Sequence, residues 1–377
     1  MSKEYRPRMS AKEYAAWQAF KESDFVVEQL SLLKQECDKA GIPLKDVRHY
    51  WYKSKLFSIF AKNEDSQIED IFERFEGLVD KYAGGEKRQI PKGEKKNKKA
   101  LKVTTTDDHV GLEPNPKGKS LFEYEYNADV YRQSMDKVYQ SVMKEYDTHG
   151  RFDFLLLDNL GDQEDGWQGK TTRAGHDLPQ NMSADEVFDV VVDTKVNMII
   201  QLAESGVADK IISRKCVNDN HSGDFGHIIN KAVAKIINLI YDKNFVEVET
   251  LTKFMEHRFY GDHCFILTHG KDEEHMRSGL PLHLNDKTIN YINDYIDFYE
   301  LKRKSKYIHV DKGDLHQIGF DKVKRFDYRN YMSFCPPSGW QQTNFGDGYS
   351  GYSVQVVPKF NNEIAHTDYF LDYKKVQ

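Results

Sequence analysis

The sequence contains few cysteines, and the four that are present lie far apart, at Cys37, Cys216, Cys264 and Cys335. Because no two of them form a C-x-x-C pair, the spacing argues against a zinc ribbon or a disulfide framework and favours reduced thiols in a cytosol. No segment approaches the roughly 20 consecutive apolar residues of a membrane span. The first ten residues, MSKEYRPRMS, lack the apolar centre of a signal peptide. We therefore expect a cytoplasmic protein with no membrane partner.

An excess of basic residues is also missing. The 54 Lys and Arg residues are outnumbered by 60 Asp and Glu residues, which gives a net charge of -6. This balance excludes a globally basic nucleic-acid binder but leaves local basic patches open. With 377 residues, of which 39% are hydrophobic, the chain is long enough for one large domain and a smaller one, each with a buried core.

The first 85 residues are expected to form a small, mostly helical module. Residues 23–41 have apolar side chains at helical spacing, and IPLKDVRHYW (residues 42–51) predicts a second short helix. Two such helices could form a helix-turn-helix. Residues 86–100, EKRQIPKGEKKNKKA, combine Gly, Pro and a run of lysines, and they predict a flexible linker to a second domain at residues 101–377.

In residues 101–377, strand patterns alternate with helix patterns. Helices are expected over four ranges, 127–146, 183–206, 225–241 and 285–300. The second of these opens with Ser183 and Glu186 in the spacing of a capping box and closes at Gly206. The pattern indicates a layered α/β or α+β fold in which helices cover sheet faces.

Five expected strands end in Asp, Asn or His. These ends are Asp107-Asp108-His109, Gly161-Asp162-Gln163-Glu164-Asp165, Asp219-Asn220-His221, Thr268-His269-Gly270 and Gly313-Asp314-Leu315-His316. One such motif alone would be read as a turn or a surface residue. Ligand sites, however, gather beyond the carboxyl ends of strands, and mixed oxygen and imidazole ligands suit Mn²⁺, Fe²⁺, Zn²⁺ or Mg²⁺. The ordered set therefore indicates a metal centre.

The order of these motifs resembles that of the calcineurin-like metallophosphoesterase superfamily, over residues 101–360. The resemblance implies a β-sandwich flanked by helices and two divalent ions. The first ion would be held by Asp107, His109, Asp162 and His316, and the second by Asp162, Asn220, His269 and Asp314. It also implies that a metal-bound hydroxide attacks phosphorus, with His221 and Asp165 as the catalytic residues and His221 protonating the leaving oxygen.

The sequence departs from the superfamily pattern in the third and fifth motifs. Asp219 and Ser222 stand where the pattern has a glycine and an acid, and Asp314 stands where it has a histidine. As a ligand, a carboxylate at 314 would favour Mn²⁺, Mg²⁺ or Fe²⁺ over Zn²⁺, and we expect Mn²⁺. In the alternative, Asp314 is structural and the second ion is weakly held.

Two stretches suggest the substrate. The loop at 161–181 and the tail at 338–352 are similar to those of uncharacterised phage and prophage phosphoesterases, and recombination-repair nucleases are the characterised branch that the chain resembles. In the loop, Trp167, Lys170, Arg173 and His176 could stack a base and hold a phosphate, or the loop could be a surface loop with one packed tryptophan.

In the first module, HYWYKSK (residues 49–55) interleaves basic and aromatic side chains, and it predicts DNA contacts by Trp51, Lys53 and Lys55. The alternative is a docking or oligomerisation module, so homo-oligomerisation stays open. The sequence thus predicts a two-metal phosphodiesterase or nuclease that hydrolyses DNA in a bacterial or phage-infected cell. Three alternatives remain, namely hydrolysis of small or cyclic nucleotides, hydrolysis of a phosphoprotein, and a DNA-binding or scaffold protein with a degenerate metal site.

Overall fold

The chain divides into two compact units, Met1–Glu86 and Lys87–Gln377, and each is described by itself. A computed structural model describes residues 35, 37, 39, 47–53, 56–61, 67–82, 87–91, 97–115, 118, 120–167, 169–172, 175–272, 274–275, 278–346 and 348–375. Among the helices in these ranges, none is long and apolar enough to cross a membrane.

The first unit contains a hairpin where the sequence predicted a helix. Strand β1 (Val47–Lys53) pairs antiparallel with β2 (Leu56–Ala61), and helix α3 (Gln67–Tyr82) follows. The expected helix over residues 42–51 is therefore wrong from Val47 onward, because the aromatic and β-branched residues of β1 find a partner strand. Trp51 pairs with Ser58 and Lys53 with Leu56. Residues 35, 37 and 39 of the first expected helix are described and are helical. Lys55 and the remaining residues of the predicted helix-turn-helix lie outside the described residues.

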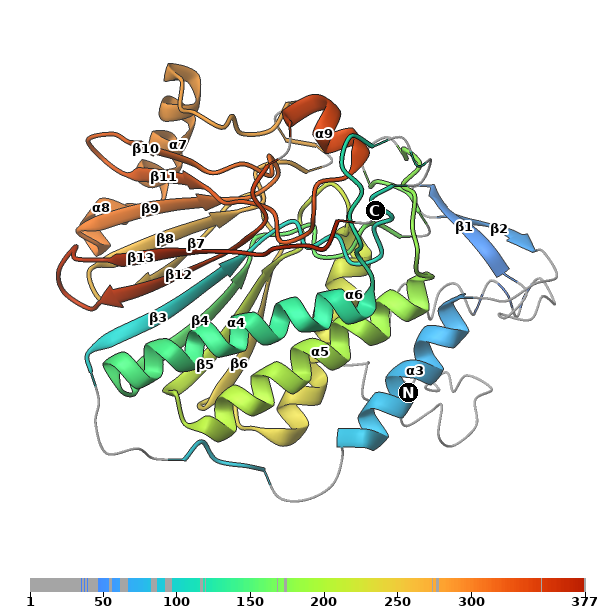
Figure 1. The fold of residues 1–377 in the computed structure, drawn as a ribbon, viewed down its shortest axis with the longest axis horizontal. Helices are drawn as coiled ribbons and strands as arrows, with labels where there is room; N and C mark the ends of the chain where they lie inside the picture. The colour runs from blue at the N-terminus through green and yellow to red at the C-terminus, as the bar shows by residue number, and fades with distance from the viewer. Residues whose placement is uncertain are drawn as a thin grey trace, which may run out of the picture. The chain divides into compact units, whose positions relative to one another are not determined.

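A six-stranded sheet forms the centre of the second unit (Figure 1), in the order β13-β12-β3-β4-β5-β6. Its strands β3 to β6 are parallel, and β12 and β13 add antiparallel pairs at one edge. Their bounds are β3 Lys99–Thr105, β4 Phe152–Asn159, β5 Ala208–Cys216, β6 Val246–Leu251, β12 Gly351–Pro358 and β13 Ala365–Phe370. This sheet supplies three of the five polar strand ends.

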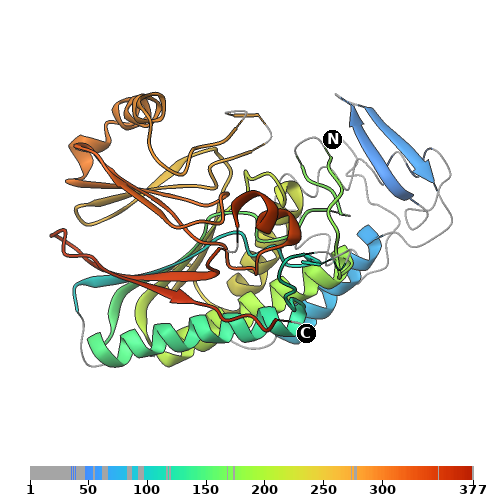
Figure 2. The ribbon, with the colours of Figure 1, turned by 45° about the horizontal axis from the view of Figure 1, so that its top comes forward.

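Three helices, α4 (Ala128–His149), α5 (Ala184–Ser205) and α6 (Gly223–Ile240), cover one face of this sheet (Figures 1 and 2). All three were expected from the sequence and are confirmed. Helix α5 begins at the predicted capping box of Ser183 and Glu186 and ends at Gly206, which has the left-handed φ of 69° that favours glycine at this position. The helices that cover this face of the sheet are therefore determined by local sequence signals, such as the capping residues of α5.

A five-stranded sheet with the order β10-β11-β9-β8-β7 faces the other side of the six-stranded sheet (Figure 2). Its strands are β7 Glu256–Tyr260, β8 His263–Thr268, β9 Tyr307–Lys312, β10 Gly319–Lys322 and β11 Asp327–Asn330. Helices α7 (Asp286–Phe298) and α8 (Leu301–Lys304) flank this sheet, and the short helix α9 (Gly339–Phe345) precedes β12 (Figure 1). The predicted β-sandwich flanked by helices is confirmed.

The two faces of β8 bury different cores. Phe265 and Leu267 join a cluster with residues of the six-stranded sheet, such as Leu156 and Val357. Cys264 and Ile266 alternate with them and pack in a second cluster with helix α7. Because both faces are covered, the end of β8 is held rigidly, and the polar residues that follow it have a fixed position.

Part of the predicted linker belongs to the second unit. The amide N of Arg88 donates to the carbonyl of Ile240 at 2.7 Å, and the amide N of Asn97 donates to the carbonyl of Arg151 at 3.0 Å. Ile90 is buried. The described residues of the predicted linker, 87–91 and 97–100, are therefore attached to this unit and do not have the expected flexibility, because an apolar side chain and backbone hydrogen bonds fix them.

Candidate metal centre

The polar segments after β3, β4, β8 and β9 are joined to one another through their backbones. The amide N of Asp107 donates to Gly161 at 3.0 Å and that of His109 donates to Asp162 at 3.0 Å, while Gly313 donates to His269 at 3.2 Å. The first two bonds join β3 to β4 and the third joins β9 to β8. Strand ends from both sheets are therefore fixed before any side chain is considered.

Five of the predicted site residues have a left-handed backbone. Among the described residues other than glycine, six have a positive φ, and five of these six lie in the motifs. They are Asp107 (54°), His109 (44°), Asp162 (48°), Asp314 (73°) and His316 (53°). This conformation is uncommon for residues with a Cβ and accumulates where a functional site needs a particular side-chain direction.

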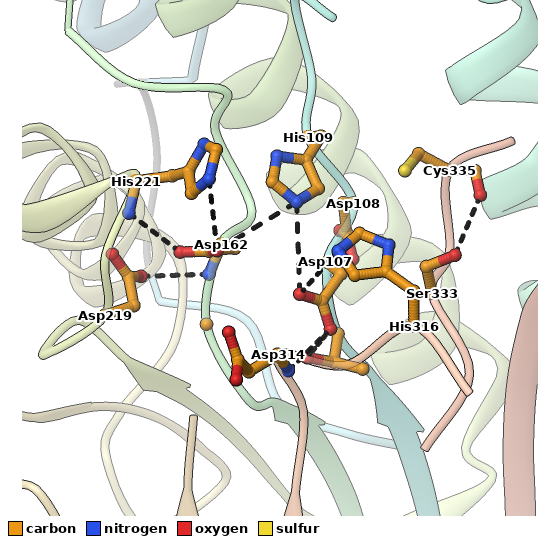
Figure 3. Close-up of polar contacts among 12 residues, drawn as sticks. Asp107, Asp108, His109, Asp162, Asp219, His221, Asp314, His316, Ser333 and Cys335 are labelled. Atoms are coloured by element: carbon orange, nitrogen blue, oxygen red, sulfur yellow. Dashed lines mark hydrogen bonds and ion pairs between the residues drawn. The ribbon is translucent and has the colours of Figure 1, made fainter. Parts of the chain in front are cut away.

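The first group of ligand atoms consists of Asp107, His109 and His316, which lie within 4.8 Å of one another (Figure 3). Oδ1 of Asp107 is 3.3 Å from Nε2 of His316 and 3.9 Å from Nε2 of His109. The other oxygen, Oδ2, accepts hydrogen bonds from the Thr106 hydroxyl at 2.7 Å and the Asp314 amide at 3.1 Å. The carboxylate is therefore held by one oxygen and presents the other to the two imidazoles.

The second group joins Asp107 and Asp162 to His269. Nε2 of His269 is 3.1 Å from Oδ2 of Asp162 and 3.1 Å from Oδ1 of Asn220, while its Nδ1 is 3.0 Å from the carbonyl of Leu160. A proton on Nδ1 that is donated to this carbonyl leaves Nε2 as the atom that can bind a metal. Burial opposes a charged imidazole, but the neighbouring Asp162 raises the pKa of His269 to about 10.

The donor atoms fit a divalent cation. Within the described part of the chain, five buried atoms of the predicted site residues have no hydrogen-bond partner, namely Asp107 Oδ1, His109 Nε2, Asp165 Oδ2, His221 Nδ1 and Asp314 Oδ2. Burial disfavours the carboxylate of Asp162, yet His269 and His221 hold its pKa well below the usual range. A cation would compensate the same negative charge that draws protons onto these imidazoles, and carboxylate, amide and imidazole donors suit Mn²⁺, Mg²⁺, Fe²⁺ or Zn²⁺.

His221 lies at the open side of this centre. Its amide N donates to Oδ1 of Asp162 at 3.0 Å, and its Nδ1 is 3.5 Å from Oδ1 of Asp165. The same oxygen of Asp165 is 2.7 Å from Nδ1 of His109, whose ring meets that of His221 edge to face. The side chain of His221 is 17% exposed, whereas that of Asp165 is 1% exposed. His221 can therefore meet a substrate, while the buried carboxylate of Asp165 lies 3.5 Å from its Nδ1.

Asp219 and Ser222, where the third motif departs from the superfamily pattern, form hydrogen bonds to the second motif. The carboxylate of Asp219 accepts hydrogen bonds from the amides of Asp162 and Gly223, both at 2.9 Å. The hydroxyl of Ser222 accepts from the amide of Glu164 and donates to its carbonyl, both at 3.1 Å. Asp219 and Ser222 thus fix the position of Asn220 and His221 relative to Asp162.

Asp314 has a different position from the other predicted ligands. It belongs to none of the three groups of ligand atoms found among the described residues, and its Oδ1 is 3.6 Å from Nζ of Lys271. Its Oδ2 is buried without a hydrogen-bond partner. The backbone of Asp314 supports Asp107, and its carboxylate faces a lysine.

The loop after the second motif is tied to the third. The amide N of Thr172 donates to the carbonyl of Asn220 at 3.2 Å. The ring of Trp167 packs edge to face on that of Phe225 in α6, with 4.8 Å between the ring centroids. This packing agrees with the interpretation of the segment as a surface loop with one packed tryptophan. Lys170 forms an ion pair with Asp177. His176 is exposed, and Arg173 lies outside the described residues.

Sequence reasoning missed Gln341, which contacts the first group. Its amide nitrogen is 2.6 Å from Nδ1 of His316, and its amide oxygen accepts a hydrogen bond from the amide of Ser338 at 2.6 Å. Ser338 and Gln341 form the capping box of α9. The S-x-x-Q spacing was visible in the tail, but it indicates a helix start and gives no sign of the histidine that the glutamine touches.

No family model matches the sequence, and no curated protein matches it. Solved structures to which the chain is similar include Vps29 from Entamoeba histolytica complexed with Zn²⁺, with 11% identity, 72% of this chain and 98% of that chain covered, and a TM-score of 0.28. A novel archaeal phosphodiesterase has 10% identity, 72% and 99% coverage, and a TM-score of 0.31. A predicted phosphoesterase from Streptococcus pneumoniae has 11% identity, 72% and 98% coverage, and a TM-score of 0.22.

Proposed function

We propose that this protein is a metal-dependent phosphoesterase, with a phosphodiester of DNA as its substrate and Mn²⁺ as its metal. The observation that carries the proposal is the meeting of Asp107, His109, Asp162, His269 and His316 beside the partly exposed His221. Two of the ligand atoms, Asp107 Oδ1 and His109 Nε2, have no hydrogen-bond partner. Residues from strand ends of two sheets would have no structural reason to bury this many ionisable groups together, since buried polar groups without partners are costly.

Two divalent ions would be held by Asp107, His109, Asp162 and His316 on one side and by Asp162, Asn220 and His269 on the other. Such ions supply Lewis-acid stabilisation of the phosphoryl oxygens and favour an attacking water at neutral pH. The carboxylate of Asp162 reaches both sides, since Oδ2 is 3.9 Å from Nε2 of His109 and 3.1 Å from Nε2 of His269. Asp107 also belongs to both groups of ligand atoms.

The proton for the leaving oxygen would come from His221. A general acid must reach the substrate, and His221 is the most exposed histidine of this centre, with 17% of its side chain exposed against 11% for His316, and the carboxylate of Asp165 lies 3.5 Å from its Nδ1. DNA as substrate is supported by the basic and aromatic residues Trp51 and Lys53 of β1 and by the lysines of residues 92–99.

The test is turnover by the full chain of bis-p-nitrophenyl phosphate, p-nitrophenyl phosphate, linear and circular DNA, and cyclic nucleotides, with Mn²⁺, Mg²⁺ and Zn²⁺ compared. We expect diester and DNA hydrolysis that a chelator abolishes and Mn²⁺ restores. The control is Asp162→Asn, which should abolish turnover at any metal concentration. Hydrolysis that survives both the chelator and this substitution would overturn the proposal.

A further inference from the structure

Lys271 and Asp314 form an ion pair at the rim of the metal centre. Lys271 follows β8, two residues after His269, and Asp314 follows β9, two residues before His316. Nζ of Lys271 is 3.6 Å from Oδ1 of Asp314, and the side chains are 32% and 6% exposed. The pair therefore consists of a buried anion and a cation that is open to solvent.

The described residues at the two ends of the loop after β8 lie close to this pair. The amide of Leu280 donates to the carbonyl of Gly270 at 2.7 Å. Gly279 has a left-handed φ of +69°, and a Cβ there would lie 3.1 Å from Cβ of Lys271 and 3.2 Å from Oδ2 of Asp314. The left-handed φ and these close contacts favour glycine at 279, whose backbone therefore approaches both members of the pair.

The negative charge of the centre suggests a role for the ammonium group of Lys271. The centre contains the carboxylates of Asp107, Asp162 and Asp165, all buried. An incoming phosphoryl group is itself anionic, so fixed cations that stabilise it in addition to the metals are valuable in a site of low dielectric constant. A lysine ammonium has three donors, and Nζ of Lys271 lies 3.6 Å from Oδ1 of Asp314, close enough for an ion pair but beyond hydrogen-bond distance, so its donors can turn to other oxygens.

We propose that Lys271, held by Asp314, binds a non-bridging oxygen of the phosphoryl group, and that Asp314 anchors this lysine instead of binding the second ion. The inference rests on the proposed function, because it names the residue that recognises the phosphoryl group in the same site. It also accounts for a carboxylate at position 314, since a neutral imidazole there could not hold an ammonium by charge.

Binding of inorganic phosphate to the Mn²⁺-loaded full chain tests this proposal, measured by isothermal titration calorimetry together with metal content. We expect Lys271→Met to raise the dissociation constant of phosphate about tenfold, which corresponds to about 1.4 kcal/mol. Lys271→Arg should restore most of the affinity, and Asp314→Asn should weaken phosphate binding in the same direction. Neither Lys271→Met nor Asp314→Asn should change the number of bound ions.

Lys306→Met is the matched control. Lys306 and Asp262 form a pair at 2.7 Å at the opposite ends of the same two strands, where no phosphate should bind. This variant should bind phosphate like the unsubstituted protein.

Two results would overturn the inference, namely unchanged phosphate affinity in Lys271→Met, or loss of one ion per chain in Asp314→Asn. Failure of the proposed function looks different, because a protein that binds phosphate through Lys271 but hydrolyses none of the substrates would retain this inference and lose the activity.

Discussion

One oxygen of Asp165 lies beside two imidazoles; it is hydrogen-bonded to Nδ1 of His109 at 2.7 Å and lies 3.5 Å from Nδ1 of His221. The first belongs to the proposed ligand set and the second is the proposed acid. We therefore expect Asp165→Asn to reduce both metal affinity and turnover, each by about 10- to 100-fold, as is typical when the partner of a ligating histidine is lost. Metal content after dialysis and turnover at saturating Mn²⁺ separate the two effects. Retention of both would show that Asp165 orients neither ring.

His221 should affect turnover alone. Because it belongs to a group with His109 and Asp165 but is the more exposed of the two histidines, His221→Ala should lower turnover by about 10²- to 10⁴-fold. Metal content should stay nearly unchanged. Substrates with good leaving groups need little protonation, so the loss should be smaller for p-nitrophenyl esters than for DNA. Equal losses for both would instead indicate a ligand or a structural role.

Among individual residues, the sequence predicted the site residues that belong to motifs. It missed contacts at the site that depend on residues distant along the chain. Asp107, His109, Asp162 and His269 follow apolar strands, so their convergence could be expected. The pairing of Asp314 with Lys271 could not, because it depends on how a loop of about ten residues closes at Gly279.

Helix α9 contributes one side chain to the centre through its own capping box. Gln341 accepts from the Ser338 amide and lies 2.6 Å from Nδ1 of His316. Gln341→Ala should therefore weaken metal binding about tenfold by releasing His316. Competition with a chelator of known affinity measures this.

Gln342→Ala is the control for this prediction. The side chain of Gln342 bonds both backbone groups of Phe122, at 2.8 and 2.7 Å, and so ties down the same helix. If the Gln341→Ala and Gln342→Ala variants lose metal equally, the effect comes from loosening α9 and not from His316.

Elements with complete local signals were predicted well, whereas those defined by pairing were not. Helix α5 carries its own start and stop residues, Ser183 and Gly206, so its bounds follow from the sequence. Strands β10 and β13 are edge strands whose registers depend on β11 and β12, and neither was foreseen. Strand β1 was taken for a helix because periodicity examines the spacing of apolar residues within one segment, whereas here the pairing of β1 with β2 decides the structure.

The two units of the whole chain can be tested separately. Residues 87–91 are attached to the second unit, so a protein that begins at Lys87 keeps every described contact of that unit. If the first unit recruits DNA, this truncated protein should hydrolyse bis-p-nitrophenyl phosphate normally but bind DNA more weakly. The difference should shrink as salt rises, because phosphate contacts release counterions. Filter binding across a salt series measures it.

A first unit without a role in recruitment would give a different outcome. Identical DNA cleavage by both forms at every salt concentration would favour a docking or oligomerisation module. Substituting Trp51 in the full chain adds a further distinction, since a base stacked on it would contribute an affinity that salt does not reduce.

The left-handed residues of the metal centre imply that activity is maintained at the expense of thermal resistance. Each such residue costs on the order of 1–3 kcal/mol. Ordinarily a glycine destabilises relative to alanine by roughly 0.5–1 kcal/mol, but at Asp162, with φ of 48°, glycine relieves strain that alanine keeps. In the presence of a chelator, Asp162→Gly should therefore melt at a higher temperature than Asp162→Ala, and the reverse order would mean that this backbone is unstrained. In homologues that are no longer selected for catalysis, replacement of Asp162 by glycine would therefore raise thermal stability while removing catalytic activity.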